Sequence, residues 1–230
     1  MIVYKNVSLM YSVNTGIKNF NLEIKDNEKV AIIGPNGSGK TTLLKITLGF
    51  SKYYKGEVLI KEVSNKDNKF NLNNIGYVSS ENIFPSFSKV KTIVNLYKKL
   101  KNDENNKLDY ISKLLKINLK EKKYFKSLST GMIQKVKLCL ALSYDNDYYI
   151  FDEPTNGLDA IIREKTLNYI YENLKQKTII YCTHLIEEIT TFFDRLIIIK
   201  DNTIKLDVEI NEKTNVKNIF YEVYGEEIND

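Results

Sequence analysis

The sequence has 230 residues, of which 43% are hydrophobic, enough to bury the interior of one large domain or of two lobes with a shared core. Its 34 basic and 29 acidic residues leave a net charge of +5, a balance that does not require a nucleic-acid partner. No apolar run approaches the roughly 18 residues of a membrane-spanning helix, and residues 1–11 lack the pattern of a signal peptide. We therefore expect a cytosolic protein whose two cysteines, Cys139 and Cys182, are buried, reduced thiols.

The first eighty residues show the alternation and the short apolar runs of strands. Phe20, Leu22 and Ile24 alternate with polar residues, which is the pattern of a half-buried strand. Residues 30–33 form a continuous apolar run, which is typical of a strand buried on both faces. The pattern predicts further elements in chain order: a helix over residues 40–48 that stops at Gly49, and strands over residues 56–60 and 74–78.

The middle of the chain has a helical pattern. Val90, Ile93, Val94 and Tyr97 are three or four residues apart, so residues 88–100 predict an amphipathic helix. A polar turn at residues 101–107 follows, and then a second predicted helix with Leu108, Ile111 and Leu115. Further along the chain, the pattern predicts strands over 147–152 and 177–183 with a helix over 161–174 between them. It also predicts a hairpin that turns at Asp201 and Asn202. Strands that alternate with helices indicate a parallel α/β core, with a helical insertion between roughly residues 85 and 140.

A glycine-rich segment, GPNGSGKT at residues 34–41, carries the strongest chemical signal. It fits the pattern G-x-x-x-x-G-K-[ST] between a buried strand and a helix, where backbone N–H groups and the helix N-terminus bind phosphate oxygens. Lys40 would reach the β- and γ-phosphates of ATP, and the Thr41 hydroxyl would ligate Mg²⁺. The predicted nucleotide-binding residues here are Gly34, Pro35, Asn36, Gly37, Ser38, Gly39, Lys40, Thr41 and Thr42.

Two adjacent carboxylates, Asp152 and Glu153, close the apolar segment YYIFDEP. At the C-terminal end of a strand, both can point into the crevice where α/β sheets bind ligands. Asp152 would hold Mg²⁺, directly or through water, and Glu153 would polarise the attacking water as general base. Alone, a surface acidic pair before Pro154 would be the better interpretation, but beside a phosphate loop the catalytic one is favoured.

His184 is the only histidine of the chain, and it follows the apolar segment 178–182. A lone histidine is more often structural or solvated than functional. Because this one ends a strand, as Asp152 does, it is a candidate to contact the γ-phosphate and the attacking water, as a sensor and orienter more than as a base.

The order of these motifs resembles the nucleotide-binding subunit of an ABC transporter over nearly the whole chain. The segment LSTGM at residues 128–132 is similar to the signature of that family, usually LSGGQ: Ser129 and Gly131 are kept, whereas Thr130 and Met132 depart. Ser129 also fits a plain helix N-cap. Both interpretations can hold together, because the N-terminus of a helix is what binds phosphate.

The resemblance implies an α/β fold: a P-loop NTPase core with an antiparallel β-subdomain at the N-terminal side and an inserted α-helical subdomain. We expect a single ABC ATPase domain over residues 1–230. Its core and β-subdomain would cover about 1–84 and 141–205, its helical subdomain about 85–140, and a short tail about 206–230.

The resemblance also implies a head-to-tail dimer, of identical or related chains, that holds two ATPs. Each ATP would lie between the phosphate loop of one chain and residues 129–131 of the other. Asp159 matches the D-loop aspartate that connects the two sites, and Tyr11 matches the aromatic residue that stacks on adenine, although Tyr11 also fits a tyrosine that packs on a strand.

One segment departs from the family pattern. The family's Q-loop usually has Pro-Gln after a strand, whereas Ser79, Ser80 and Glu81 follow the strand here, with Ser80 in the place of the glutamine. Serine is too short both to touch Mg²⁺ or the attacking water and to contact a membrane partner. Ser80 or Glu81 is therefore a further candidate metal ligand, and either the coupling runs differently or hydrolysis is slow.

The resemblance predicts an ATP-hydrolysing subunit on the cytoplasmic face of the cell membrane, with ATP and Mg²⁺ as cofactors and no nucleic-acid partner. It would power a separate membrane-spanning protein, contacted through residues 80–90 and the helical subdomain. The short tail is similar to that of compact export-type subunits, which move drugs, peptides or lipids or confer immunity to a peptide antibiotic. Two alternatives stay open: a soluble ABC ATPase that acts on nucleic acid or ribosomes, and a nucleotide-gated module that does not hydrolyse.

Overall fold

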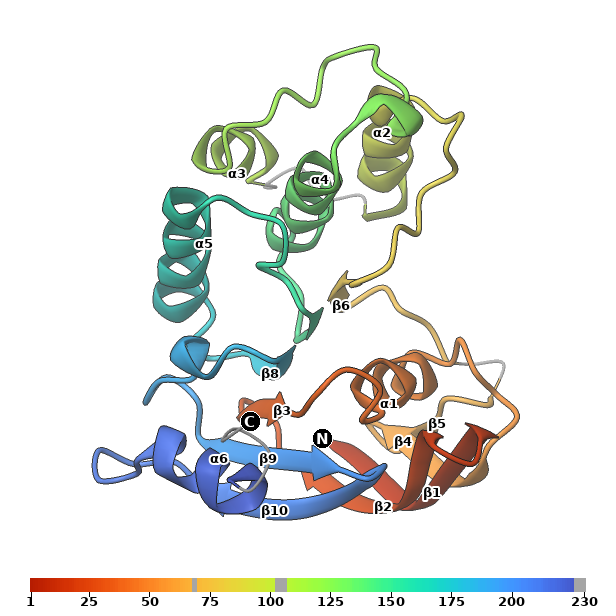
Figure 1. Cartoon of the computed structure of the whole chain (residues 1–230). Coiled ribbons are helices and arrows are strands. Elements are labelled where there is room, and N and C mark those ends of the chain that lie inside the picture. Colours follow the sequence, from red (N-terminus) through yellow and green to blue (C-terminus); the bar gives the residue numbers. More distant parts are fainter. Residues whose placement is uncertain (68–69, 102–106, 226–230) are drawn as a thin grey trace. The chain divides into compact units, whose positions relative to one another are not determined.

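The computed structural model describes residues 1–67, 70–101 and 107–225, so the polar turn predicted over 101–107 lies almost entirely outside the described residues. The chain forms two compact units, one of Met1–Asn71 with Thr178–Asp230 and one of Leu72–Lys177 (Figure 1). The subdomain boundaries predicted near residues 85, 140 and 205 divide the chain differently, and that division stays a prediction.

The first unit contains an antiparallel sheet with the strand order β2-β1-β4-β5. The predicted alternation is confirmed, because Phe20, Leu22 and Ile24 are buried and the residues between them are exposed. Ile24 and Leu22 pair with Ile2 and Tyr4 of the neighbouring strand, so apolar side chains meet across the two strands. The strands are β1 (Ile2–Ser12), β2 (Thr15–Ile24), β4 (Lys55–Ile60) and β5 (Val63–Ser64).

A second sheet of the same unit is built around β3 (Lys29–Ile33). This strand pairs in parallel with β8 on one side and β9 on the other, which explains why the predicted apolar run 30–33 is completely buried. The hairpin of β9 and β10 turns at Asp201 and Asn202, as predicted, and their φ values of 51° and 62° are those of a tight two-residue turn. The other strands are β8 (Thr178–Thr183), β9 (Arg195–Lys200) and β10 (Thr203–Glu209).

Three helical segments complete the described part of this unit: α1 (Lys40–Thr47), the 3-10 turn η2 (Ile186–Glu188) and α6 (Val216–Tyr224). Helix α1 follows β3 and ends where the sequence predicts, with φ +70° at Gly49. Helix α6 is anchored to the end of β9, because the Tyr224 hydroxyl donates a hydrogen bond of 2.6 Å to the carbonyl oxygen of Ile199.

The second unit combines two parallel strands, β6 (Ile75–Val78) and β7 (Tyr148–Asp152), with helices. Val90 and Val94 face the interior from the predicted amphipathic helix, and the three apolar residues of the second predicted helix are buried as well. The helical segments among its described residues are α2 (Val90–Lys101), α3 (Leu108–Leu114), η1 (Phe125–Ser127), α4 (Thr130–Leu142) and α5 (Ala160–Asn173).

This mixed α/β architecture confirms the predicted fold class. Cys139 and Cys182 are buried thiols, one in α4 and one in β8. Within residues 1–67, 70–101 and 107–225, no helix has the length and the apolar character needed to cross a membrane.

Candidate functional site

Residues 34–39 join the end of β3 to the start of α1 and form the predicted phosphate loop. Two of its glycines have backbone angles that side chains rarely adopt, with φ +83° at Gly37 and +111° at Gly39. A Cβ atom on Gly39 would also lie 2.4 Å from the carbonyl oxygen of Gly16, whereas a Cβ on Gly37 would meet no atom within 4 Å. The glycines therefore allow a tight turn and leave the backbone at Gly37 open to a ligand.

The start of α1 gives the loop a positive end. Lys40 is buried, and its ammonium group donates hydrogen bonds to the carbonyl oxygens of Gly34, 2.6 Å away, and of Pro35, 3.1 Å away. The first turn of α1 contains no carboxylate, and Gly39 at the N-cap supplies no side-chain cap, so the helix N-terminus is suited to an anion. Thr41 lies in this first turn. The end of the helix thus has the charge and the donors for a phosphate chain.

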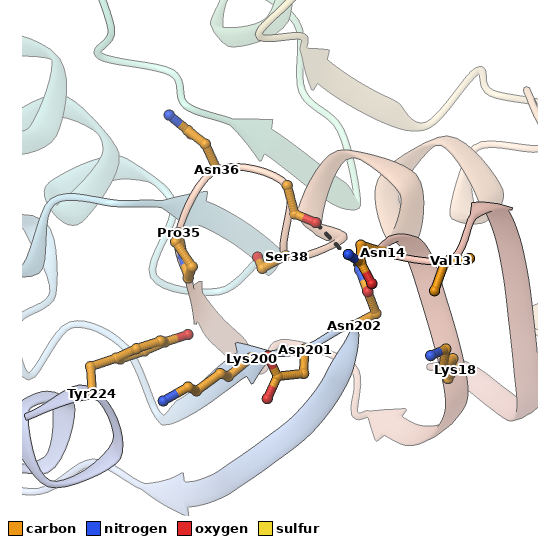
Figure 2. A pocket seen from close by; sticks show the side chains of 11 residues that line it. Val13, Asn14, Lys18, Pro35, Asn36, Ser38, Lys200, Asp201, Asn202 and Tyr224 are labelled. Atoms are coloured by element: carbon orange, nitrogen blue, oxygen red, sulfur yellow. Dashed lines mark hydrogen bonds between the residues drawn. The ribbon is translucent and has the colours of Figure 1, made fainter. Parts of the chain in front are cut away.

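Asn202, which the sequence marks only as a turn residue, ties the loop to two other elements (Figure 2). Its side-chain amide donates to the carbonyl oxygen of Gly16 at 2.8 Å and to that of Gly37 at 3.3 Å. Its own carbonyl oxygen accepts the N–H of Lys18 at 2.8 Å. The side chain is only 5% exposed and borders a cavity of about 390 Å³ between the loop, the β9–β10 hairpin and Tyr224. Asn202 therefore acts as a brace for the phosphate loop.

Two further predicted residues belong to the same unit. Tyr11, near the end of β1, is 57% exposed, so a face of its ring is accessible for stacking. His184 follows β8 directly and is exposed. The end of that strand is held by Glu188, a buried carboxylate missed from sequence, which accepts hydrogen bonds of 2.9 Å from the hydroxyls of Tyr181 and Thr183. Glu188 fixes the backbone from which His184 projects.

In the second unit, Asp152 and Glu153 lie at the end of β7, and both are buried. The Ser80 hydroxyl donates a hydrogen bond of 2.6 Å to a carboxylate oxygen of Asp152. Glu81 is exposed, and its backbone N–H donates to the Ser79 hydroxyl at 3.1 Å. Of the two candidates in the place of the family's glutamine, Ser80 is thus hydrogen-bonded to Asp152.

The chemistry of these donors fits magnesium. Carboxylate and hydroxyl oxygens are the ligands that Mg²⁺ prefers, and it commonly binds one or two carboxylates together with substrate phosphates. Asp152 and Ser80 supply such a pair of oxygens at one strand end. The described ranges contain no group of three or more His, Cys, Asp and Glu side chains that would hold a metal.

Two helices of this unit begin at predicted site residues that act as N-caps. The Ser129 hydroxyl accepts the N–H of Met132 at 3.2 Å and caps α4. Asp159 caps α5 by accepting the N–H of Ile162 at 3.0 Å, and this hydrogen bond, with the nearby Lys135, holds the pKa of Asp159 below its usual value. Both cap functions are local, and they leave the N-terminus of α4 in place as a possible anion site.

The start of α4 is anchored to the segment that carries Glu153. A Cβ atom on Gly131 would lie 2.4 Å from the carbonyl oxygen of Gly157, so the close approach between the helix and the loop after β7 requires a glycine. The Gln134 side chain donates to the carbonyl oxygens of Glu153 at 3.1 Å and of Pro154 at 2.9 Å. Hydrogen bonds from α4, which begins in the signature segment, thus hold the backbone at the predicted base.

A phosphate loop between a buried parallel strand and a helix, in a mixed α/β fold, defines a P-loop NTPase. Residues 17–156, more than half of the chain, match the protein family described as ABC transporter. The chain is 30% identical to the phosphonates import ATP-binding protein PhnC of Lactococcus lactis subsp. cremoris, over 99% of this chain and 100% of that protein. It therefore belongs to the ABC transporter family, and it is an ATPase of that family.

Two other relatives are longer. The chain is 32% identical to the Fe(3+) ions import ATP-binding protein FbpC of Fusobacterium nucleatum subsp. nucleatum, over 87% of this chain and 56% of that protein. It is 29% identical to the uncharacterized ABC transporter ATP-binding protein YdbJ of Bacillus subtilis, over 84% of this chain and 64% of that protein. The chain thus spans less than two thirds of these two relatives.

Solved structures agree with this assignment. The dimeric structure of a bacterial ABC transporter cassette is similar to this chain with a TM-score of 0.78 at 26% identity, over 92% of this chain and 99% of that one. The same cassette in a post-hydrolysis state bound to ADP and Pi has a TM-score of 0.77. The predicted family and fold class are confirmed, while the roles of single site residues stay predictions.

Proposed function

We propose that this chain binds ATP with Mg²⁺ on its phosphate loop, hydrolyses it and thereby powers a separate membrane-spanning transporter. The observation that carries the proposal is the loop itself: Gly37 leaves the backbone open, Lys40 lies at its base, and the first turn of α1 contains no carboxylate. Residues 34–42 would hold the phosphates, and Tyr11 would stack on the adenine.

For hydrolysis, Glu153 would act as general base on the attacking water, and His184 would orient that water against the γ-phosphate. Thr41, Asp152 and Ser80 would be the protein ligands of Mg²⁺. When bound, the ion would neutralise charge on the phosphates. The hydrogen bonds from Gln134 to the carbonyl oxygens of Glu153 and Pro154 support this assignment, because they fix the backbone that presents the base.

The second half of the site would come from another chain. Ser129 and Gly131 sit at the N-terminus of α4, whose first turn contains no acidic residue, so this end is suited to a γ-phosphate. In the proposed head-to-tail dimer, each ATP lies between one chain's phosphate loop and the partner's α4, and Asp159 connects the two sites. The dimeric form of the similar cassette supports this arrangement.

The membrane partner would bind the second unit through residues 80–90 and the neighbouring helices. Ile83 and Phe87 are 51% and 76% exposed, and Leu96 and Leu100, one turn apart on α2, are also exposed. Exposed apolar side chains of this kind are what a bound partner would cover. They suit the apolar face of a cytoplasmic helix of a membrane protein, which would locate this subunit at the inner face of the membrane.

The most specific part of the proposal concerns the transported substrate and the direction of transport. The sequence predicts export of a drug, peptide or lipid, or an immunity pump. Several similar proteins are named as importers, of phosphonates, of Fe(3+) ions and of spermidine/putrescine. We keep export as the prediction and let the identity of the membrane partner decide it.

The test uses Glu153→Gln, which should keep ATP binding and lose the base. With ATP and Mg²⁺, the purified variant should elute as a dimer by size exclusion with light scattering. The matched control, Lys40→Ala with Glu153→Gln, should stay monomeric because it does not bind nucleotide. A monomeric Glu153→Gln variant at saturating ATP would contradict the composite site.

The transport role is tested by pulling down tagged Glu153→Gln protein from native membranes with ATP and identifying its partners by mass spectrometry. A protein with several membrane spans in near-equal amount is expected, and its identity indicates cargo and direction. Recovery of ribosomal or DNA-bound proteins, without a membrane protein, would instead support a soluble ABC ATPase.

A further inference from the structure

Lys137 is a charged residue on the buried, largely apolar face of α4, which also contains Gln134. Its side chain is 4% exposed, and its neighbours on that face, Ile133, Val136 and Leu140, are buried. The ammonium group donates a hydrogen bond of 2.7 Å to the carbonyl oxygen of Ser79 and one of 3.2 Å to the side-chain oxygen of Gln134. A cation thus lies directly behind the segment that departs from the family pattern.

The hydrogen bonds of Lys137 connect it indirectly to the Asp152 carboxylate and to the backbone of Glu153. Ser79 precedes Ser80, whose hydroxyl is bound to Asp152, and Gln134 is bound to the carbonyl oxygen of Glu153. Ser80, Gln134 and Lys137 also line a cavity of about 240 Å³ in the second unit. The ammonium group therefore joins the segment after β6 to the end of β7 through α4.

Burial of this ammonium group opposes folding. Burial lowers the pKa of Lys137 to about 8, although Asp152 and Glu81 act in the opposite direction. A buried charge of this kind is weak evidence for a stabilising role, and apolar residues of similar volume often serve stability as well or better. A group that is unfavourable for stability and lies beside catalytic carboxylates is a candidate for a functional role.

We propose that Lys137 is a positioning residue for ATP hydrolysis, which holds the Ser79 backbone in place and thereby keeps the Ser80 hydroxyl on Asp152. This inference rests on the proposed hydrolytic site. In the family pattern, one glutamine side chain would span this region. Here a short serine is kept in place by a lysine from α4, so two residues share the task.

The test compares Lys137→Met with the wild type and with Lys137→Arg. Methionine keeps most of the volume and removes the charge. We expect its kcat for ATP hydrolysis to fall at least tenfold, its Kd for ATP to stay within twofold, and its Tm to stay equal or rise. Lys137→Arg should recover part of the kcat, because it keeps a cation that donates hydrogen bonds.

A matched control shows whether an effect on kcat comes from the position of Lys137 or merely from the loss of a buried lysine. Lys101 is also a partly buried lysine of this unit with a pKa lowered by burial, but it binds Asn146 at 2.7 Å and the Ile75 carbonyl oxygen at 3.4 Å, at the other end of β6. Lys101→Met should lower Tm and leave kcat unchanged. Should Lys137→Met not fold, Lys137→Gln replaces it in the same comparison.

A double-mutant cycle shows whether Lys137 acts through Ser80. If it does, Lys137→Met combined with Ser80→Ala should be no slower than Ser80→Ala alone. A Lys137→Met enzyme with wild-type kcat, or losses that multiply in the double variant, would overturn the inference. A wild-type protein without ATPase activity would instead overturn the proposed function, so the two failures are distinguishable.

Discussion

The replacement of Asn202 tests whether a residue of the β9–β10 hairpin preorganises the phosphate loop. Asn202→Gly keeps the left-handed turn, since glycine adopts φ 62° without strain, and removes both amide hydrogen bonds. Each of these bonds contributes about 1 kcal/mol net, so we expect a loss of about 2 kcal/mol in the free energy of unfolding. For a chain of this size, that corresponds to a decrease of about 4–8 °C in Tm.

The same change should weaken ATP binding, because one of the two bonds holds the carbonyl of Gly37. A loss of about 1 kcal/mol of loop organisation raises the Kd about fivefold, which isothermal titration calorimetry resolves. Asn202→Asp should be worse at neutral pH, because its carboxylate would face two carbonyl oxygens and could donate to neither.

The control is Asp201→Gly, at the preceding turn position with φ 51°. Asp201 is exposed and forms an ion pair with Lys205 at 3.6 Å, so its loss should change Tm and Kd only marginally. Equal Tm and Kd values for Asn202→Gly and Asp201→Gly would refute the role of Asn202 as a brace of the phosphate loop.

Three further changes probe other parts of the chain. Lys40→Ala should abolish ATP binding in calorimetry, and an unchanged affinity would mean that the loop is misassigned. Ser80→Gln restores the family's side chain and should raise kcat; an equal kcat would show that the Ser80 hydroxyl already supplies what hydrolysis needs. Arg195→Lys should lower the free energy of unfolding, measured by urea titration, by about 1–2 kcal/mol. The reason is that the bidentate pair with Asp207 and the contact to Glu28 at 3.3 Å depend on a planar guanidinium group. An unchanged urea midpoint would contradict this expectation.

The sequence alone determined the local elements of this protein and the chemistry of its loop. The run 30–33 is apolar because β3 is flanked by a strand on each side and is therefore buried. This burial is visible in the sequence as a continuous apolar run. The turn at Asp201 and Asn202 and the N-cap Ser129 depend on interactions within a few residues. For the same reason, the motif at residues 34–41 could be placed between a strand and a helix.

Only the tertiary structure decided which of these residues work together. Asn202 reaches carbonyl groups 186 and 165 residues away, Ser80 binds a carboxylate 72 residues away, and Lys137 binds a carbonyl 58 residues away. Such contacts leave no periodicity in the sequence, because they depend on where the chain returns after several elements. Lys137 could be noticed as a charge on an apolar helix face, but its partner could not. Sequence patterns report interactions between residues that are close along the chain, and these could be predicted. Contacts between residues far apart along the chain depend on packing, so only the fold revealed them.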